Sequence, residues 1–260
     1  MVTHFHKYHG TGNDFIMMDA RNSNFVAPDP DIIAWLCNRR LGIGADGLVT
    51  IHSHKNLDFL MKYYNSDGIE GSLCGNAGRC AMVYANRLGI VKQTARFEAY
   101  DGIHESLINP DKTVKLTMLP VSNVRYFNDH YELNTGSPHY VKFLDSVEKM
   151  DARSEGAAIR YSHQYQKEGI NVNFVSAYKD GIYVRTYERG VEDETLSCGT
   201  GNIASAICAA IHTKSNKRIY TVYTRGGILR VSFDRTGEEH FENITLEGPV
   251  KFVYEGDVEV

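Results

Sequence analysis

Two segments of this chain follow the same pattern, one in each half of the sequence. Each contains a Cys-Gly pair, at Cys74 and at Cys198, with a glutamate four residues before it and a stretch of alanine and other small residues after it. The stretch after Cys198 is apolar on nearly every side, which is typical of a fully buried helix. A strand-like run comes before each cysteine, at 59–64 and at 182–187. The repeated order predicts an internal duplication into two similar halves.

Most of the other predicted elements are strands. Runs of β-branched and aromatic residues bounded by glycine, asparagine or aspartate are typical of strands, and they occur at 58–64, 114–119, 172–178, 182–187, 218–223, 228–233 and 251–254. Helices are expected at 30–40, 78–88 and 202–213, with a short helical turn at 145–150. We therefore expect an α+β (mixed α/β) fold of two pseudo-symmetric domains, each with a curved β-sheet wrapped around a central helix.

The boundary between the two domains is expected close to Pro120, where an extended run meets proline. The first domain would then cover residues 1–118 together with the C-terminal strand at 251–260. The second would cover residues 119–250. Because each half carries one copy of the cysteine motif, we expect the active site in the cleft between the domains.

Composition excludes several classes of partner. The formal net charge of the 260 residues is −4, which gives no electrostatic reason to expect a nucleic acid or an anionic membrane. The longest apolar run is far shorter than the ~18 residues of a membrane span, and the N-terminal segment has no apolar region typical of a secretory signal. Five cysteines, an odd number without the spacing of a disulfide framework, fit a reducing compartment. A cytoplasmic protein is expected.

The chemistry of the two motifs follows from a thiol placed at a helix start. The positive end of the helix dipole lowers the pKa of such a thiol. The same helix start offers backbone N–H groups that bind a carboxylate, here those of Gly75, Asn76, Gly199 and Thr200. Two such thiols facing one amino acid can remove its α-proton from one side and return a proton to the other. At any moment one must be a thiolate and the other a thiol.

Other interpretations of these residues are weaker. A single cysteine is more often a small buried core residue, but the repeated context favours catalysis for Cys74 and Cys198. The remaining cysteines, Cys37, Cys80 and Cys208, lie within predicted helices and are expected to pack in the core. No close Cys/His set has tetrahedral metal spacing, the glycines of 10–15 indicate a tight turn rather than a phosphate loop, and no lysine has a recognisable pyridoxal phosphate context. We expect no metal and no cofactor.

The sequence resembles the diaminopimelate epimerase family over nearly its whole length. The resemblance rests on an ordered set of motifs at residues 10–15, 39–47, 65–68, 74–76, 138–139, 169–174, 187–190 and 195–201. It implies a cofactor-independent isomerase that interconverts LL-2,6-diaminopimelate and meso-diaminopimelate for lysine and peptidoglycan precursor biosynthesis. It also implies a homodimer.

The resemblance implies a role for individual residues. Cys74 and Cys198 would be the catalytic acid–base pair, supported and polarised by His139 and Glu188. The end of the substrate away from the reacting carbon would be held by Asn13, Asn65, Asn171, Glu188 and Arg189. The reacting carboxylate would be held by Gly75, Asn76, Gly199 and Thr200. Ser137 departs from the family, since many members have asparagine before the Pro-His pair, which puts one distal contact in doubt.

Three alternatives remain open. A proline or hydroxyproline racemase on the same scaffold would have histidine in place of Asn76 and would lack the adjacent Glu188 and Arg189. A phenazine-type isomerase would lack the paired cysteines. A non-enzymatic amino-acid-binding module would need neither thiol, so Cys74→Ser would leave its function intact.

Overall fold

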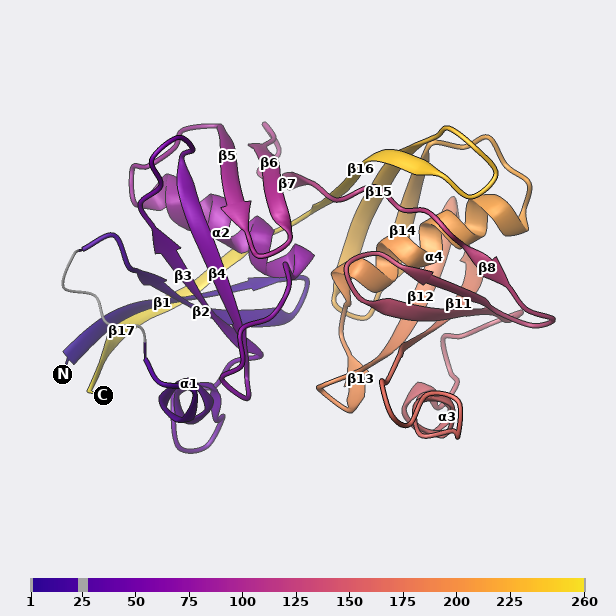
Figure 1. Cartoon of the computed structure of the whole chain (residues 1–260), viewed down its shortest axis with the longest axis horizontal. Coiled ribbons are helices and arrows are strands. Elements are labelled where there is room, and N and C mark those ends of the chain that lie inside the picture. Colours follow the sequence, from indigo (N-terminus) through magenta and orange to yellow (C-terminus); the bar gives the residue numbers. More distant parts are fainter. Residues whose placement is uncertain (1, 23–27, 260) are drawn as a thin grey trace. The chain divides into compact units, whose positions relative to one another are not determined.

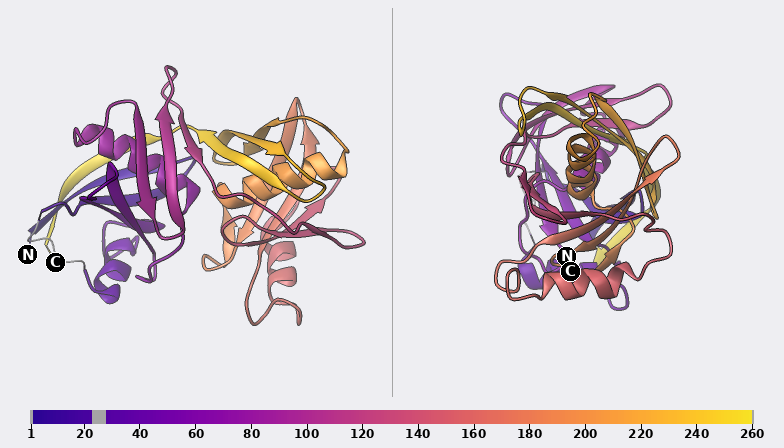
Figure 2. Two further views of the ribbon diagram at one scale, coloured as in Figure 1. Left: turned by 45° about the horizontal axis from the view of Figure 1, so that its top comes forward. Right: turned by 90° about the vertical axis from the view of Figure 1, so that its right-hand side faces the viewer.

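The computed structural model describes residues 2–22 and 28–259. The chain forms two compact units, Met1–Leu116 with Gly248–Val260 and Thr117–Glu247. Each unit has strands that surround one long helix, α2 (Gly75–Arg87) in the first and α4 (Gly199–His212) in the second (Figure 1). The helix α4 is seen end-on in the right-hand view of Figure 2. The mixed α/β fold with one central helix in each half is as predicted.

The two units repeat one order of connections. In the first, β1 (Val2–Gly10) pairs with β2 (Asn13–Asp19), β2 pairs in parallel with β3 (Gly47–His52), β3 forms a hairpin with β4 (Phe59–Asn65), and β4 pairs in parallel with β5 (Thr94–Ala99). Antiparallel β6 (Gly102–Ile108) and β7 (Val114–Thr117) follow. The C-terminal strand β17 (Lys251–Glu259) pairs with β1.

The second unit has the same succession. After the short β8 (Arg125–Tyr126), β9 (Tyr131–Asn134) pairs with β10 (Pro138–Phe143), β10 in parallel with β11 (Asn171–Tyr178), β11 with β12 (Gly181–Glu188), and β12 in parallel with β14 (Ile219–Thr224). The antiparallel β15 (Gly227–Arg235) and β16 (Phe241–Gly248) follow, and the short β13 (Asp193–Thr195) pairs antiparallel with the end of β12. The helix α2 between β4 and β5 therefore corresponds to α4 between β12 and β14. The predicted duplication is confirmed.

The smaller helices occupy equivalent places as well. α1 (Pro30–Cys37) joins β2 to β3, and α3 (Ala152–Arg160) joins β10 to β11. The helical turn predicted at 145–150 is wrong, because those residues form turns and bends and the helix begins only at Ala152. Asp151 fixes that start, since its carboxylate accepts a hydrogen bond from the backbone N–H of Ser154 at 3.1 Å.

Several strands were not predicted, and β1 shows why. The side chains of Phe5 and Lys7 lie on the opposite face from those of His6 and Tyr8, and all four are buried. Phe5 packs in a core with α1, while the rings of His6 and Tyr8 contact Tyr84 of α2. A strand buried on both faces has no apolar–polar alternation, and the polar residues of β1 prevent its sequence from resembling a continuous apolar strand.

The glycine-containing turn after β1 is confirmed. Thr11 and Gly12 both have positive φ angles, 53° and 88°, and Gly10 pairs with Asn13 across the turn. This is a two-residue hairpin of type I′, whose twist matches that of the strands it joins. It places Asn13 at the first position of β2.

The long helices form the centre of each core. In the second unit, Ile203 and Ile207 of α4 pack among apolar side chains of the surrounding strands, such as Val222 and Leu246. Among the described helices, none combines the length and apolar character that crossing a membrane requires.

Candidate active site

Cys74 is the N-cap residue of α2. Its backbone is extended (φ −84°, ψ 119°), and its carbonyl accepts the hydrogen bond from Gly78 N–H that opens the helix. The half-buried thiol lies 3.5 Å from Oδ1 of Asn13, and the same oxygen accepts a hydrogen bond from Nδ2 of Asn76 at 3.1 Å. The structure therefore brings together three residues predicted for the site.

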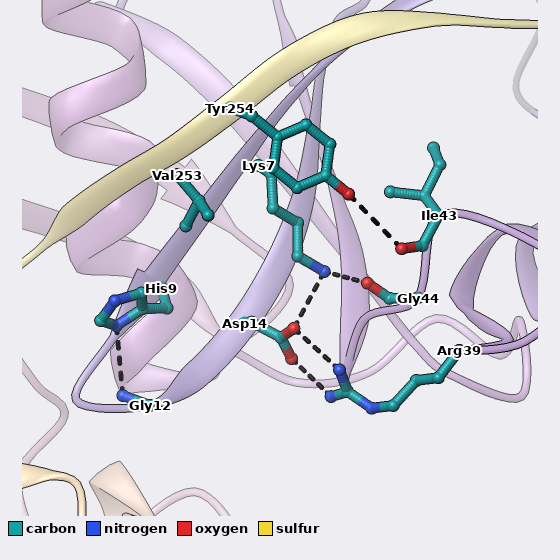
Figure 3. Close-up of a pocket in the computed structure, with 9 residues that line it drawn as sticks. All are labelled: Lys7, His9, Gly12, Asp14, Arg39, Ile43, Gly44, Val253 and Tyr254. Carbon is teal, nitrogen blue, oxygen red and sulfur yellow. Dashed lines mark hydrogen bonds and ion pairs between the residues drawn. The ribbon is translucent and has the colours of Figure 1, made fainter.

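A cluster of charged residues holds Asn13 in place. Nδ2 of Asn13 donates to Oδ2 of Asp46 at 2.6 Å, and Arg39 contacts both Asp46 and Asp14 at 2.7 Å. Burial by itself raises the pKa of Asp14, but hydrogen bonds from Arg39 and Lys7 outweigh it and lower the pKa to about 2. Figure 3 shows Lys7, Asp14 and Arg39 of this cluster, which line an open pocket of about 380 Å³. Since its charges are already paired, its evident role is to fix the start of β2.

Near Cys74 lies a buried cation, Arg79, that was not among the predicted site residues. Arg79 is fully buried in α2, donates to Oδ1 of Asn76 at 2.8 Å and reaches the carbonyl of Gly75 at 3.3 Å. Burial lowers its pKa to about 10, and the neighbouring Cys80 and Cys74 act in the opposite direction. No carboxylate forms an ion pair with it within the described ranges. An arginine between the small residues Gly78 and Cys80 was the available sequence signal.

Cys198 repeats the arrangement in the second unit. It is the N-cap of α4, with an extended backbone (φ −101°, ψ 116°), and its buried sulfur lies 3.5 Å from Oγ1 of Thr200. The Thr200 hydroxyl lies 3.3 Å from Oγ of Ser137, which in turn lies 3.3 Å from Nε2 of His139. A chain of hydroxyl groups therefore links the sulfur to the imidazole. The role of Ser137 at this junction was not foreseen.

The imidazole of His139 is fully buried at the start of β10. Nδ1 lies 3.1 Å from Nδ2 of Asn173, whose Oδ1 accepts a hydrogen bond from Thr186 at 2.9 Å. Burial, helped by the positive charge of Arg189, lowers the pKa of His139 from 6.5 to about 3. His139 is therefore neutral near pH 7. It orients the hydroxyl groups that lead to Cys198 without adding a positive charge beside them. Gly201 permits this packing, since a Cβ there would lie 2.3 Å from Oδ1 of Asn173.

This burial predicts how stability depends on pH. The unfolded chain takes up a proton at His139 below pH 6.5, whereas the native protein takes it up only near pH 3. The free energy of unfolding should therefore decrease as pH falls between these values, by up to about 1.4 kcal/mol per pH unit from this residue. In His139→Gln the slope should be shallower by that amount, measured by urea unfolding at a series of pH values.

The exposed His163, in the same unit, supplies the matched control. His163→Gln should leave the slope of the wild-type protein between pH 6.5 and 3 unchanged. An equally steep slope in His139→Gln and the wild-type protein would show that the native protein protonates His139, contrary to its buried neutral state.

The residues predicted to hold the distal end of a substrate are partly brought together. Asn171 donates from Nδ2 to the carbonyl of Pro138 at 3.1 Å and accepts at Oδ1 from the backbone N–H of Arg189 at 2.9 Å. Glu188 accepts a hydrogen bond from Thr195 at 2.9 Å. In the first unit, Asn65 lies exposed at the end of β4, where its backbone bonds with that of the following loop. None of the hydrogen bonds described for Asn13 and Asn65 joins the two residues.

The other three cysteines are core residues, as predicted. Cys37, Cys80 and Cys208 are buried and free of disulfides. Burial raises the pKa of Cys37 to about 12 and raises those of Cys80 and Cys208 further. These thiols stay protonated near neutral pH, so only the two N-cap cysteines combine a helix start with a polar surrounding.

Comparisons with known proteins agree with this arrangement. A sequence model of the family described as diaminopimelate epimerase matches residues 5–124 and 131–253. Among similar proteins, the diaminopimelate epimerase of Flavobacterium psychrophilum is 47% identical, covering 96% of this chain and 98% of its own. That of Chlorobaculum tepidum is 39% identical, with the same two coverages.

Solved structures share the fold at low sequence identity. A PhzF-family phenazine biosynthesis protein of Bacillus anthracis superposes with a TM-score of 0.76 at 14% identity, covering all of both chains. A hydroxyproline epimerase of Agrobacterium vitis gives 0.73 at 13% identity, covering 99% of this chain and 92% of its own. At these identities the likeness establishes the fold alone. The sequence relatives decide the family: this chain belongs to the diaminopimelate epimerase family, a family of isomerases.

Proposed function

We propose that this protein interconverts LL- and meso-diaminopimelate without a cofactor, with Cys74 and Cys198 as the two acid–base groups. Family membership supports the substrate. The observation that carries the mechanism is that both cysteines are N-cap residues of the equivalent central helices, with extended backbones. The duplicated fold thus supplies two matching thiols, one for each side of an α-carbon.

Besides the thiols, the proposed reaction needs hydrogen-bond donors for the reacting carboxylate, and the helix starts supply them. Neither α2 nor α4 has a side-chain cap or an acidic residue in its first turn. No acidic side chain of the helix itself therefore neutralises the positive end of either helix dipole, and N–H groups at such a helix start suit an external carboxylate. Removing an α-proton places negative charge on that carboxylate, and preorganised N–H groups stabilise the charge as it develops. This supports the assignment of Gly75, Asn76, Gly199 and Thr200 to the reacting carboxylate.

The charged residues around the two cysteines differ between the halves, and this difference bears on which of the two sulfurs more readily loses its proton. Position 79 of α2 is a buried arginine, whereas the corresponding position of α4 is Ile203. Around Cys198 the buried ionisable group is the neutral His139. Opposite charges stabilise each other strongly where water is excluded. We infer that Arg79 stabilises the thiolate of Cys74 when it forms, whereas in the described structure the Cys74 thiol donates to Oδ1 of Asn13. One turnover exchanges the protonation states of Cys74 and Cys198.

The distal end of the substrate is assigned to Asn13, Asn65, Asn171, Glu188 and Arg189. The exposed Arg189 has its backbone fixed by Asn171, and its guanidinium Nη1 donates to the carbonyl of Glu168 at 3.0 Å. An arginine can hold a carboxylate through two parallel hydrogen bonds, and the adjacent Glu188 offers an acceptor for an ammonium group. An acid and a base side by side suit the second amino-acid end of diaminopimelate.

Deuterium incorporation tests the proposed function. With LL-diaminopimelate in heavy water at initial rates, the meso product should carry one deuterium, at the inverted α-carbon, while recovered substrate remains protiated. The reason is that the returning proton comes from a thiol that has exchanged with solvent. Mass spectrometry and NMR of both isomers provide the measurement.

The same experiment distinguishes the alternatives. The control is L-proline or hydroxyproline under the same conditions, for which no exchange is expected. Exchange with proline but none with diaminopimelate would establish the racemase alternative and overturn the proposed substrate. Meso product without deuterium would contradict a two-base mechanism, because the group that removed the proton would then have returned it before any exchange with solvent.

We further propose a homodimer in the cytoplasm. The family resemblance implies the dimer, and exposed apolar side chains on β17, those of Phe252, Val253 and Tyr254, are consistent with a protein-covered face. The presence of free thiols in all five cysteines suits a reducing compartment. Sedimentation equilibrium tests the oligomeric state.

A further inference from the structure

A group of metal-ligating side chains lies on β1 and β17, apart from the residues assigned to catalysis. His4 is directly opposite Asp257 in the antiparallel pair, and His6 is directly opposite Glu255. Residues two apart on a strand share a face, and so do their cross-strand partners. Two imidazoles and two carboxylates therefore gather on one face of the paired first and last strands of the described chain.

These side chains are close enough to share an ion. One ligand atom each from His4, His6 and Glu255 lie within 4.8 Å of one another. Nε2 of His6 is 2.9 Å from Oε2 of Glu255, and Nδ1 of His4 is 2.8 Å from Oδ1 of Asp257. The two imidazole rings are 5.0 Å apart and nearly perpendicular.

We propose that His4, His6 and Glu255 bind a divalent cation that prefers imidazole ligands, Zn²⁺ being the representative, and that Asp257 orients His4. Two imidazoles and a carboxylate form a common zinc ligand set, with water as the fourth ligand. Mg²⁺ and Ca²⁺ prefer oxygen ligands, so a site with two imidazoles does not suit them. The proposal is independent of the epimerase function.

The hydrogen bonds around the two histidines suit such a site. Asp257 accepts a hydrogen bond from Nδ1 of His4, so the lone pair lies on Nε2, and a carboxylate in this position is the usual second partner of a metal-bound histidine. Nδ1 of the buried His6 has no hydrogen-bond partner in the described structure. Metal binding would move the His6 proton from Nε2, which faces Glu255 in the described structure, to Nδ1, where it displaces no other bond. The ion's bonds must exceed the cost of leaving that buried N–H without a partner.

Only small movements are needed to complete the geometry. Ligand atoms bound to one tetrahedral zinc ion at about 2.0–2.1 Å lie about 3.3 Å apart, against the 4.8 Å limit seen here. His4 and Glu255 are exposed, so rotation of their side chains can close the difference, whereas the buried His6 stays in place.

One neighbouring cation competes for the site. Arg87, near the end of α2, donates to Oε2 of Glu255 at 2.6 Å and lies over the ring of Phe252. A metal ion would replace this contact and would be repelled by the guanidinium. Arg87 is therefore expected to weaken binding, and its removal should strengthen binding by on the order of 10-fold.

Binding would join the two ends of the described chain within the first unit, because His4 belongs to β1 and Glu255 to β17. An ion that binds only the folded pair of strands stabilises that pair by mass action. The bound ion would therefore increase the free energy of unfolding of the first unit and leave the catalytic rate unchanged.

Zinc titration of the untagged protein tests the proposal. Calorimetry should show that the wild-type protein binds one Zn²⁺ per chain. His4→Gln should bind this ion with an affinity weaker by about 100-fold or more. Asp257→Asn should weaken binding about 10- to 100-fold, and Arg87→Gln should strengthen it. Zn²⁺ should raise the melting temperature of the wild-type protein but raise it less in His4→Gln, whose melting temperature in EDTA should equal that of wild type because residue 4 is exposed.

Two controls make the outcome decisive. The exposed His240→Gln, in the other unit, should bind Zn²⁺ like wild type. Because thiolates also bind zinc, Co²⁺ serves as a second probe: the site should show cobalt absorption without a sulfur charge-transfer band. Three results would each overturn the proposal. The first is equal Zn²⁺ affinity and stoichiometry in His4→Gln and the wild-type protein, and the second is no Zn²⁺ binding by the wild-type protein. The third is a sulfur charge-transfer band from the Co²⁺ ion that His4→Gln fails to bind.

Discussion

Replacing either Cys74 or Cys198 with alanine is expected to reduce the rate of diaminopimelate epimerisation by about four orders of magnitude or more. In the proposed mechanism each sulfur serves one side of the α-carbon, and no other titratable side chain caps α2 or α4. The loss should appear in kcat as well as in kcat/KM, because proton transfer, rather than ground-state binding, is removed. Coupled measurement of meso product from the LL isomer provides the rate.

A partial reaction should survive in each variant and identify the remaining sulfur. In Cys74→Ala, Cys198 can still remove and return a proton on its own side, so slow solvent exchange without inversion should occur with one diastereomer. In Cys198→Ala the exchange should occur with the other. The same diastereomer exchanging in both variants would contradict the placement of the two sulfurs on opposite sides.

The core cysteines provide matched controls for these substitutions. Cys80→Ala and Cys208→Ala lie in the same two helices as the N-cap residues, but their thiols are fully buried and their pKa values are raised by that burial. Both should retain rates close to wild type. A loss in the control variants as large as that in Cys74→Ala would indicate damage to the helices rather than the removal of an acid–base group.

Replacing Arg79 with methionine is expected to lower the thiolate fraction of Cys74 and to reduce kcat by about 30-fold. Two unit charges one to two helical turns apart, at an effective dielectric constant of 20, interact by about 2 kcal/mol, which corresponds to that factor. The measurement is the rate of Cys74 alkylation by iodoacetamide as a function of pH, followed by mass spectrometry of the labelled peptide. The profile should move toward higher pH, while the Cys198 profile moves much less.

A conservative variant and a stability measurement separate charge from structure. Arg79→Lys keeps the charge and should retain most Cys74 reactivity, and the exposed Arg96→Gln, in the same unit, should change nothing. The methionine variant should unfold at a similar urea concentration, since the cost of burying an unpaired charge disappears together with its hydrogen bonds. An unchanged alkylation profile in Arg79→Met would show that Arg79 only packs.

Local patterns were sufficient for the central helices and for many of the strands. The predicted helices at 78–88 and 202–213 are present, but they begin at Gly75 and Gly199, because the cysteines rather than later residues are the caps. Strands rich in β-branched and aromatic residues and bounded by glycine, asparagine or aspartate, such as β15, were predicted from that composition. Strands buried on both faces or carrying buried polar groups, such as β1 and β10, were not.

For the candidate site, sequence pattern was informative about the cysteines but less so about what surrounds them. Ser137 was noted only as a departure from the family, yet its hydroxyl joins Thr200 and His139. Asp46 holds Asn13, although the two belong to different segments. These contacts connect residues far apart in the sequence, so no local period or spacing marks them.

By itself, the sequence determined the duplication, the family and the two candidate thiols, because a helix start and its N-terminal N–H groups are local properties of the chain. The tertiary structure decided what distinguishes the two thiols. It buried Arg79 beside Cys74 and the neutral His139 in the network of Cys198. It also brought His4 and His6 against Glu255 from the opposite end of the chain. Burial and long-range pairing set these charges and neighbours, and both depend on how distant segments pack.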